Sequence, residues 1–99
     1  GITDKDVTGL GGTHNITKNT NYLNINVTAA QGYKIKKYSY VIYKTGTNIV
    51  IRTNTVTPST PDNNVTATVN IKDISSRVGK VEVYYITLDG SFGKVVKNE

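Results

Sequence analysis

Two stretches of the chain alternate apolar and polar residues almost without interruption. Residues 22–28 read Tyr-Leu-Asn-Ile-Asn-Val-Thr, and residues 65–72 read Val-Thr-Ala-Thr-Val-Asn-Ile-Lys. Because successive side chains of an extended strand point to opposite faces, each stretch has one apolar wall and one Asn/Thr wall. This alternation predicts two strands of an antiparallel sheet that buries one face and leaves the other in water.

Similar but less regular patterns predict the remaining strands. We expect a first strand within residues 2–10 or 16–20, followed by strands at 21–30, 36–44, 48–56, 65–72, 79–88 and 93–97. Hairpin turns are expected at 45–48 and at 89–90, where glycine sits among polar residues. The two prolines and the Asp-Asn-Asn run make 57–64 a loop. Asp73 as a cap and Gly79 as a stop predict one short helical turn near residues 73–78.

Side-chain alternation also assigns faces within two of these strands. Tyr38 and Tyr40 are expected on the core face of the third strand, with Tyr43 on the opposite face. In the fourth strand, Val50 and Arg52 are two residues apart and should share a face.

Seven short strands at roughly ten-residue spacing, with no long helix, indicate an all-β protein. The predicted fold is an immunoglobulin-like (Ig-like) antiparallel β-sandwich of about seven strands, and a small barrel is the alternative. In the Ig-like order, strands 21–30 and 65–72 would be neighbours. The 99 residues suit a single domain. We expect 1–99 to be one Ig-like module, excised from a longer multidomain protein.

The segment Asn70–Ile74, together with Gly79–Gly90, resembles the last third of bacterial Ig-like and fibronectin type III-like modules. In those modules a strand and a short turn precede a Val/Tyr-rich strand that ends in an acidic-Gly hairpin. They recur in surface proteins, in secreted glycan-degrading enzymes as accessory domains, and in phage tail proteins. The Cys…Trp…Cys core of antibody domains is missing here, and the resemblance implies that Tyr38 or Tyr40 replaces the Trp.

Composition supports a folded β protein but does not fix its compartment. Hydrophobic residues make up 36% of the chain, and Thr and Asn fill the deficit. Val, Ile, Thr and Tyr favour strands over disorder. Cysteine is absent, which rules out disulfides and thiolate chemistry. No apolar run approaches the about 20 residues that cross a bilayer. We expect a cell-surface, secreted or phage-virion protein with no membrane span.

The positive charge is diffuse. The net charge is +5, but only Arg52 and Arg77 are arginines, whereas nucleic-acid binders concentrate Arg and Lys on one surface. We therefore expect no nucleic-acid partner. The densest group is Lys34, Lys36 and Lys37, which we interpret as a solvated loop and strand start. Its functional interpretation is weak attraction to an anionic cell wall or polysaccharide.

Catalytic and metal-binding patterns are lacking. His14 is the only histidine, in a Gly-rich segment that should be exposed, so neither a multi-His metal site nor a Ser/His/Asp arrangement can be built. Asp4 and Asp6, with Asp62 or Asp89, could contribute to a Ca²⁺ site, and that ion takes 6–8 oxygens. Solvated acids are the better interpretation. Glu82 alternates with valines and is expected to face solvent. We predict no enzyme activity, no cofactor and no metal.

Tyrosines are the remaining candidates for binding. Tyr33, Tyr43 and Tyr84 fall in turns or on faces opposite the apolar walls, where an amphipathic ring can stack on sugars or anchor a protein. With the lysines, the candidate ligand-binding residues are Tyr33, Tyr43, Tyr84, Lys34, Lys36 and Lys37. The expected function is a non-catalytic structural or adhesion module that contacts neighbouring modules, a protein or a cell-surface glycan. The alternative is a carbohydrate-binding accessory module that uses surface tyrosines.

Overall fold

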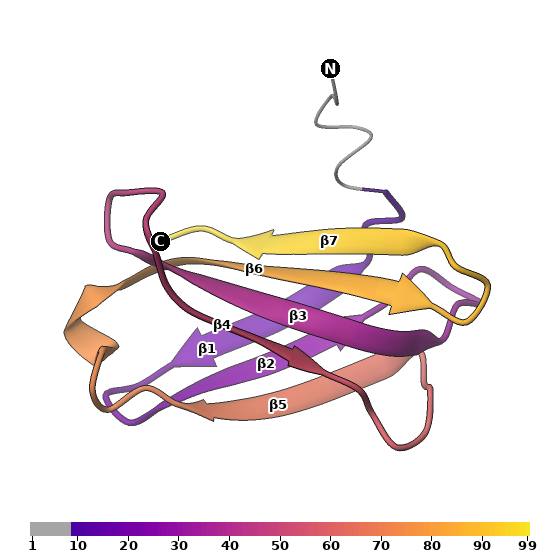
Figure 1. The fold of residues 1–99 in the computed structure, drawn as a ribbon, viewed down its shortest axis with the longest axis horizontal. Coiled ribbons are helices and arrows are strands. Elements are labelled where there is room, and N and C mark those ends of the chain that lie inside the picture. Colours follow the sequence, from indigo (N-terminus) through magenta and orange to yellow (C-terminus); the bar gives the residue numbers. More distant parts are fainter. Residues whose placement is uncertain (1–8) are drawn as a thin grey trace.

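The computed structural model describes residues 9–99 and contains seven strands and one 3-10 turn (Figure 1). The strands are β1 (Thr13–Lys18), β2 (Tyr22–Thr28), β3 (Ile35–Lys44), β4 (Val50–Val56), β5 (Asn64–Asn70), β6 (Val78–Thr87) and β7 (Phe92–Lys97), and the turn is Ser75–Arg77. They form two separate antiparallel sheets, ordered β1-β2-β5 and β4-β3-β6-β7. The predicted β-sandwich is confirmed, and the small-barrel alternative is wrong.

The strand boundaries agree with the sequence pattern. Strands β2 to β7 each begin and end within two residues of the prediction, and the 3-10 turn lies inside the predicted 73–78 segment. The first strand is β1, which overlaps the predicted 16–20 but begins earlier. The alternative first strand at 2–10 lies almost entirely outside the described residues.

The two best-patterned strands are neighbours, as predicted. Their register pairs apolar residue with apolar residue: Leu23 with Val69, Ile25 with Ala67 and Val27 with Val65. On the opposite face the pairs are Asn and Thr, and the side-chain amide of Asn64 donates to Asn26 Oδ1 at 2.7 Å and to Thr28 Oγ1 at 2.9 Å. The apolar wall is buried in the core, and the Asn/Thr wall faces outward.

The four-stranded sheet supplies the large core side chains. Tyr38 and Tyr40 are buried, at 4% and 6% exposure, as the sequence predicts. Tyr85 is 1% exposed and packs on Gly93 of β7, where any Cβ would overlap its ring. The Tyr85 hydroxyl donates to the backbone carbonyl of Gly11 at 2.6 Å. This core tyrosine therefore ties the incoming N-terminal segment to the sandwich.

A bulge in β4 contradicts one prediction about which side chains share a face. The register of β3 and β4 shifts between Ile42 and Tyr43, so Val50 pairs with Tyr43 while Arg52 pairs with Ile42. Val50 is exposed, whereas Arg52 reaches the other sheet and donates to Asn70 O at 2.8 Å and to Asp73 Oδ2 at 2.6 Å. The prediction that Val50 and Arg52 share a face is wrong, because the extra residue of a bulge breaks the period of two.

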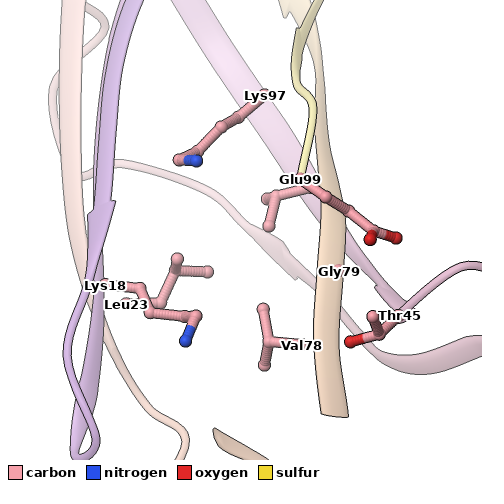
Figure 2. Close-up of a pocket in the computed structure, with 8 residues that line it drawn as sticks. Lys18, Leu23, Thr45, Val78, Gly79, Lys97 and Glu99 are labelled. Carbon is pink, nitrogen blue, oxygen red and sulfur yellow. The ribbon is translucent and has the colours of Figure 1, made fainter. Parts of the chain in front are cut away.

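The described chain enters and leaves at opposite ends of β7. Gly9 bridges to Gly93 near the start of β7, and Glu99 lies beyond its other end. Six strand residues at about 3.3 Å each separate the two points by about 20 Å. At the exit end, a cleft of about 350 Å³ lies between the sheets (Figure 2). It is lined by Lys18, Leu23, Thr45, Val78, Gly79, Val81, Lys97 and Glu99.

Candidate interaction face

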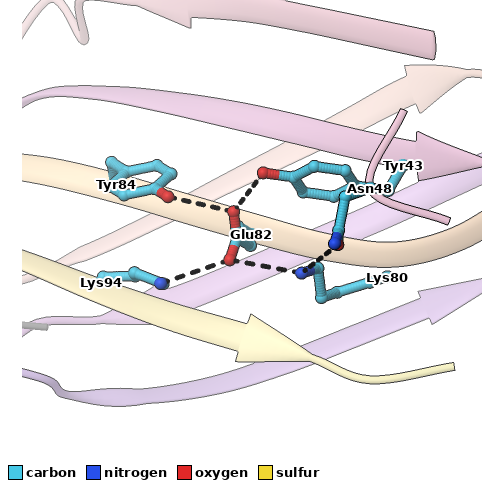
Figure 3. A network of polar contacts seen from close by, with 6 residues as sticks. All are labelled: Tyr43, Asn48, Lys80, Glu82, Tyr84 and Lys94. Atoms are coloured by element: carbon cyan, nitrogen blue, oxygen red, sulfur yellow. Dashed lines mark hydrogen bonds and ion pairs between the residues drawn. The ribbon is translucent and has the colours of Figure 1, made fainter. Parts of the chain in front are cut away.

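The outer face of the four-stranded sheet carries the most elaborate polar arrangement of the described chain. In β6 the inward residues are Val81, Val83 and Tyr85, so the alternating residues between them point outward. These meet one tyrosine from β3 and one lysine from β7 (Figure 3). We call this set the Glu82 cluster, and it consists of Tyr43, Lys80, Glu82, Tyr84 and Lys94.

Both oxygens of the Glu82 carboxylate are occupied. Tyr43 and Tyr84 donate their hydroxyls to Oε1 at 2.6 and 3.0 Å. Lys94 and Lys80 place their ammonium groups 3.3 and 3.9 Å from Oε2. Glu82 is only 5% exposed. The prediction that it faces solvent is wrong: it lies on the outer face as alternation requires, but its neighbours cover it.

The two lysines also cover the tyrosine rings. Lys80 Nζ lies 4.4 Å from the centre of the Tyr43 ring, and Lys94 Nζ lies 5.5 Å from that of Tyr84. Both distances fit cation–π contacts. Lys80 Nζ is also 3.4 Å from Asn48 Oδ1. Each ring thus contributes its hydroxyl to the carboxylate and one face to a lysine.

The cluster has settled protonation states. Burial alone would raise the pKa of Glu82, but hydrogen bonds from Tyr43, Tyr84 and Lys94 outweigh it and hold the pKa below its ordinary value. The bond to Glu82, followed by burial, raises the pKa of Tyr43 to about 12. Burial, followed by the same carboxylate, raises the pKa of Tyr84. At neutral pH the carboxylate is therefore ionised and both phenols are protonated.

These charges suit binding better than proton transfer. An efficient general acid or base has a pKa near the operating pH, and the pKa values of Glu82 and both tyrosines are shifted away from neutrality. Two lysines and one carboxylate give the cluster a formal charge of +2 − 1 = +1. Within residues 9–99, no three His, Asp or Glu side chains are grouped as metal ligands. Asp4 and Asp6 lie outside the described residues.

The six predicted binding residues lie in two regions of the sandwich. Tyr43 and Tyr84 are half-buried on the outer face, and Lys37 lines a small groove of about 190 Å³ with Tyr84. At the far end, Tyr33 and Lys34 line a depression of about 460 Å³ between the β2–β3 and β6–β7 loops. Lys36 is exposed at the start of β3. Whether any of them binds a ligand stays a prediction.

The residues that sequence reasoning missed are Lys80, Glu82 and Lys94. The first two carried a usable signal, because Lys80, Glu82 and Tyr84 are spaced by two in one strand and must share a face. Lys94 carried none, because its place opposite Tyr84 depends on the β6–β7 register. The predicted exposure of His14 is confirmed, although it lies on β1.

Comparison with known proteins identifies the fold class only. No protein-family model matches the chain, and no curated protein sequence matches it. Among solved structures, a hypothetical protein from Pyrococcus horikoshii OT3 is similar, with a TM-score of 0.60 and 8% sequence identity. The match covers 98% of this chain and 94% of that one. At this identity the likeness concerns the β-sandwich fold alone. No helix in the described part of the chain is long and apolar enough to cross a membrane.

Proposed function

We propose that the chain is a non-catalytic Ig-like module of a bacterial extracellular, cell-wall or phage protein, where it acts as a spacer or adhesion unit. The strand order supports this proposal. Ig-like sandwiches pair strands B and E in one sheet and C, F and G in the other. Here β2 pairs with β5, and β3, β6 and β7 share a sheet. The fourth strand lies beside β3, as strand C′ does in variable-type domains.

The positions of the chain ends support a serial arrangement. The described chain enters beside the start of β7 and leaves beyond its end. A module with this geometry can be joined to others end to end, whereas a module whose ends lie together is more easily inserted as a side branch. This geometry is the observation that carries the spacer role.

Two copies of the chain fused end to end provide a test of the spacer role. Small-angle X-ray scattering should give a maximum dimension about twice that of the single chain. A fused protein as compact as a globule of the same mass would contradict the proposal. The single 99-residue chain is the matched control.

For the adhesion role, the Glu82 cluster is the favoured contact region. Its excess positive charge, with Lys37 nearby, favours a partner with anionic groups such as an acidic cell-surface polymer. The carbohydrate-stacking alternative finds less support, because lysines cover one face of the Tyr43 and Tyr84 rings. Sugar stacking needs an open aromatic face.

Nuclear magnetic resonance (NMR) titration separates these two roles. An anionic polymer such as polyglutamate should shift the amides around Lys80 and Lys94, and Lys80→Gln with Lys94→Gln should weaken the effect several-fold. Lys72→Gln, an exposed lysine elsewhere, is the control and should leave it unchanged. A neutral polysaccharide that shifts the same amides more strongly than polyglutamate would favour the carbohydrate-binding module.

A further inference from the structure

The cleft at the exit end combines an apolar floor with two lysines. Leu23 and Val81, each 1% exposed, form the floor with Val78. Figure 2 shows the ammonium groups of Lys18 and Lys97 extending into the space above them. Neither lysine forms an ion pair with any residue from 9 to 99. The Glu99 carboxylate points away and accepts a hydrogen bond from Gly46 N. Such a cleft suits an apolar group that carries a negative charge.

A matching group sits at the opposite end of the same molecule. The β6–β7 hairpin presents Leu88, which is 56% exposed, followed directly by Asp89. Asp89 Oδ1 accepts hydrogen bonds from Thr87 Oγ1 at 2.5 Å and from Ser91 N at 3.0 Å. These bonds fix the carboxylate in the turn. The hairpin tip is therefore a preorganised leucine and carboxylate pair.

The cleft and the hairpin tip lie at the two ends of the module that would be joined if copies of the chain followed one another. The cleft lies where the chain leaves, since Glu99 is one of its lining residues. The tip lies where the chain enters, since Leu10 N donates to Phe92 O at 2.9 Å just after the hairpin. When one module follows another, the exit end of the first, which carries the cleft, is joined to the entry end of the next, which carries the hairpin tip.

We propose that the cleft receives the β6–β7 hairpin tip of a second copy of this chain. Leu88 packs on the floor, and Asp89 lies between Lys18 and Lys97. This inference rests on the proposed serial arrangement of modules. The contact is heterologous, so each copy offers one tip and one cleft. Its small area makes association between free molecules weak, and a flexible tether between modules raises the effective concentration of one for the other.

Complementary variants test the contact by sedimentation velocity and by NMR, at concentrations up to about millimolar. The cleft variant carries Lys18→Glu and Lys97→Glu, and the tip variant carries Leu88→Asn. The wild-type chain should associate as its concentration rises, whereas each variant alone should stay monomeric. Their equimolar mixture should form a dimer and stop there, because only one intact tip and one intact cleft remain. Lys72→Glu reverses the charge of an exposed lysine that lies outside both the cleft and the hairpin tip, and it should associate like the wild type.

Two results would overturn the proposal. One is a wild-type chain that stays monomeric up to millimolar concentration, or a mixture of variants that gives no dimer. The other is decanoate shifting the amides of Leu23 and Val78 while the protein stays monomeric, which would assign the cleft to a free fatty carboxylate. Neither result would contradict the proposed spacer role, because small-angle X-ray scattering of the fused pair tests that role separately.

Discussion

The hydrogen bond from Tyr43 to Glu82 should contribute measurably to stability, and Tyr43→Phe removes it with little change of shape. The hydroxyl lies 2.6 Å from Oε1 of a carboxylate that is 5% exposed. Hydrogen bonds to charged groups contribute about 1.5–3 kcal/mol. Because Tyr43 is half-buried, water can partly replace the bond. We therefore expect Tyr43→Phe to lower the free energy of unfolding at neutral pH by about 1.5 kcal/mol.

The same bond predicts how this loss changes with pH. The pKa of Tyr43 rises from 10.0 to about 12 in the folded chain. A rise of this size corresponds to about 2.7 kcal/mol of preference for the protonated phenol. A raised pKa stabilises the fold fully below the unfolded value and loses its effect as pH climbs through the folded value. The difference between wild type and Tyr43→Phe should therefore fall between pH 10 and pH 12. Because this loss of about 2.7 kcal/mol exceeds the gain of about 1.5 kcal/mol at neutral pH, the difference should reach zero within that range and then change sign.

Urea unfolding followed by circular dichroism measures both effects. A double-mutant cycle with Glu82→Gln isolates the pair, and we expect a coupling energy of about 1 kcal/mol at neutral pH. Tyr22→Phe is the matched control, because Tyr22 is 38% exposed on β2 of the other sheet and does not contact Glu82. Its coupling to Glu82→Gln should be near zero.

The reasoning fails if the Tyr43–Glu82 coupling is no larger than that of the Tyr22 control. It also fails if the stability difference between wild type and Tyr43→Phe stays constant up to pH 12. Either result would mean that the carboxylate is solvated and that the phenol does not sense its charge.

Two further substitutions probe how the sandwich is closed. Gly93→Ala places a Cβ inside the Tyr85 ring and should lower the free energy of unfolding by about 2 kcal/mol. The double variant Gly93→Ala/Tyr85→Leu should recover part of this loss. An unchanged thermal midpoint in Gly93→Ala would show that Tyr85 moves freely and would contradict the prediction. Asn63→Asp removes the side-chain amide that donates to the carbonyls of Ala29, Ala30 and Tyr33 at 3.3, 3.1 and 2.8 Å. This substitution should lower the free energy of unfolding by about 2 kcal/mol and speed hydrogen exchange of the backbone amides in the β2–β3 loop. Equal exchange rates in wild type and Asn63→Asp would contradict this role.

The strands were predictable because their signal is local. Alternation depends only on the period of two, so Leu23, Ile25 and Val27 reveal a buried wall without knowledge of its partner. Turn chemistry is equally local: Gly46 and Gly90 adopt positive φ at the two predicted hairpins. The candidate site was only half predictable. Tyr43 and Tyr84 were found as outward residues, but their shared carboxylate was assigned to solvent.

The sequence by itself determined an all-β chain, its strand positions and the neighbouring apolar walls of β2 and β5, because these follow from the order of side chains along each strand. Only the tertiary structure decided which side chains from different strands contact each other. The β3–β4 bulge turns Arg52 toward Asp73, and the β6–β7 register sets Lys94 against Glu82. Register and bulges depend on the whole sheet, so a charged residue on an outer face can still be buried by neighbours distant in sequence.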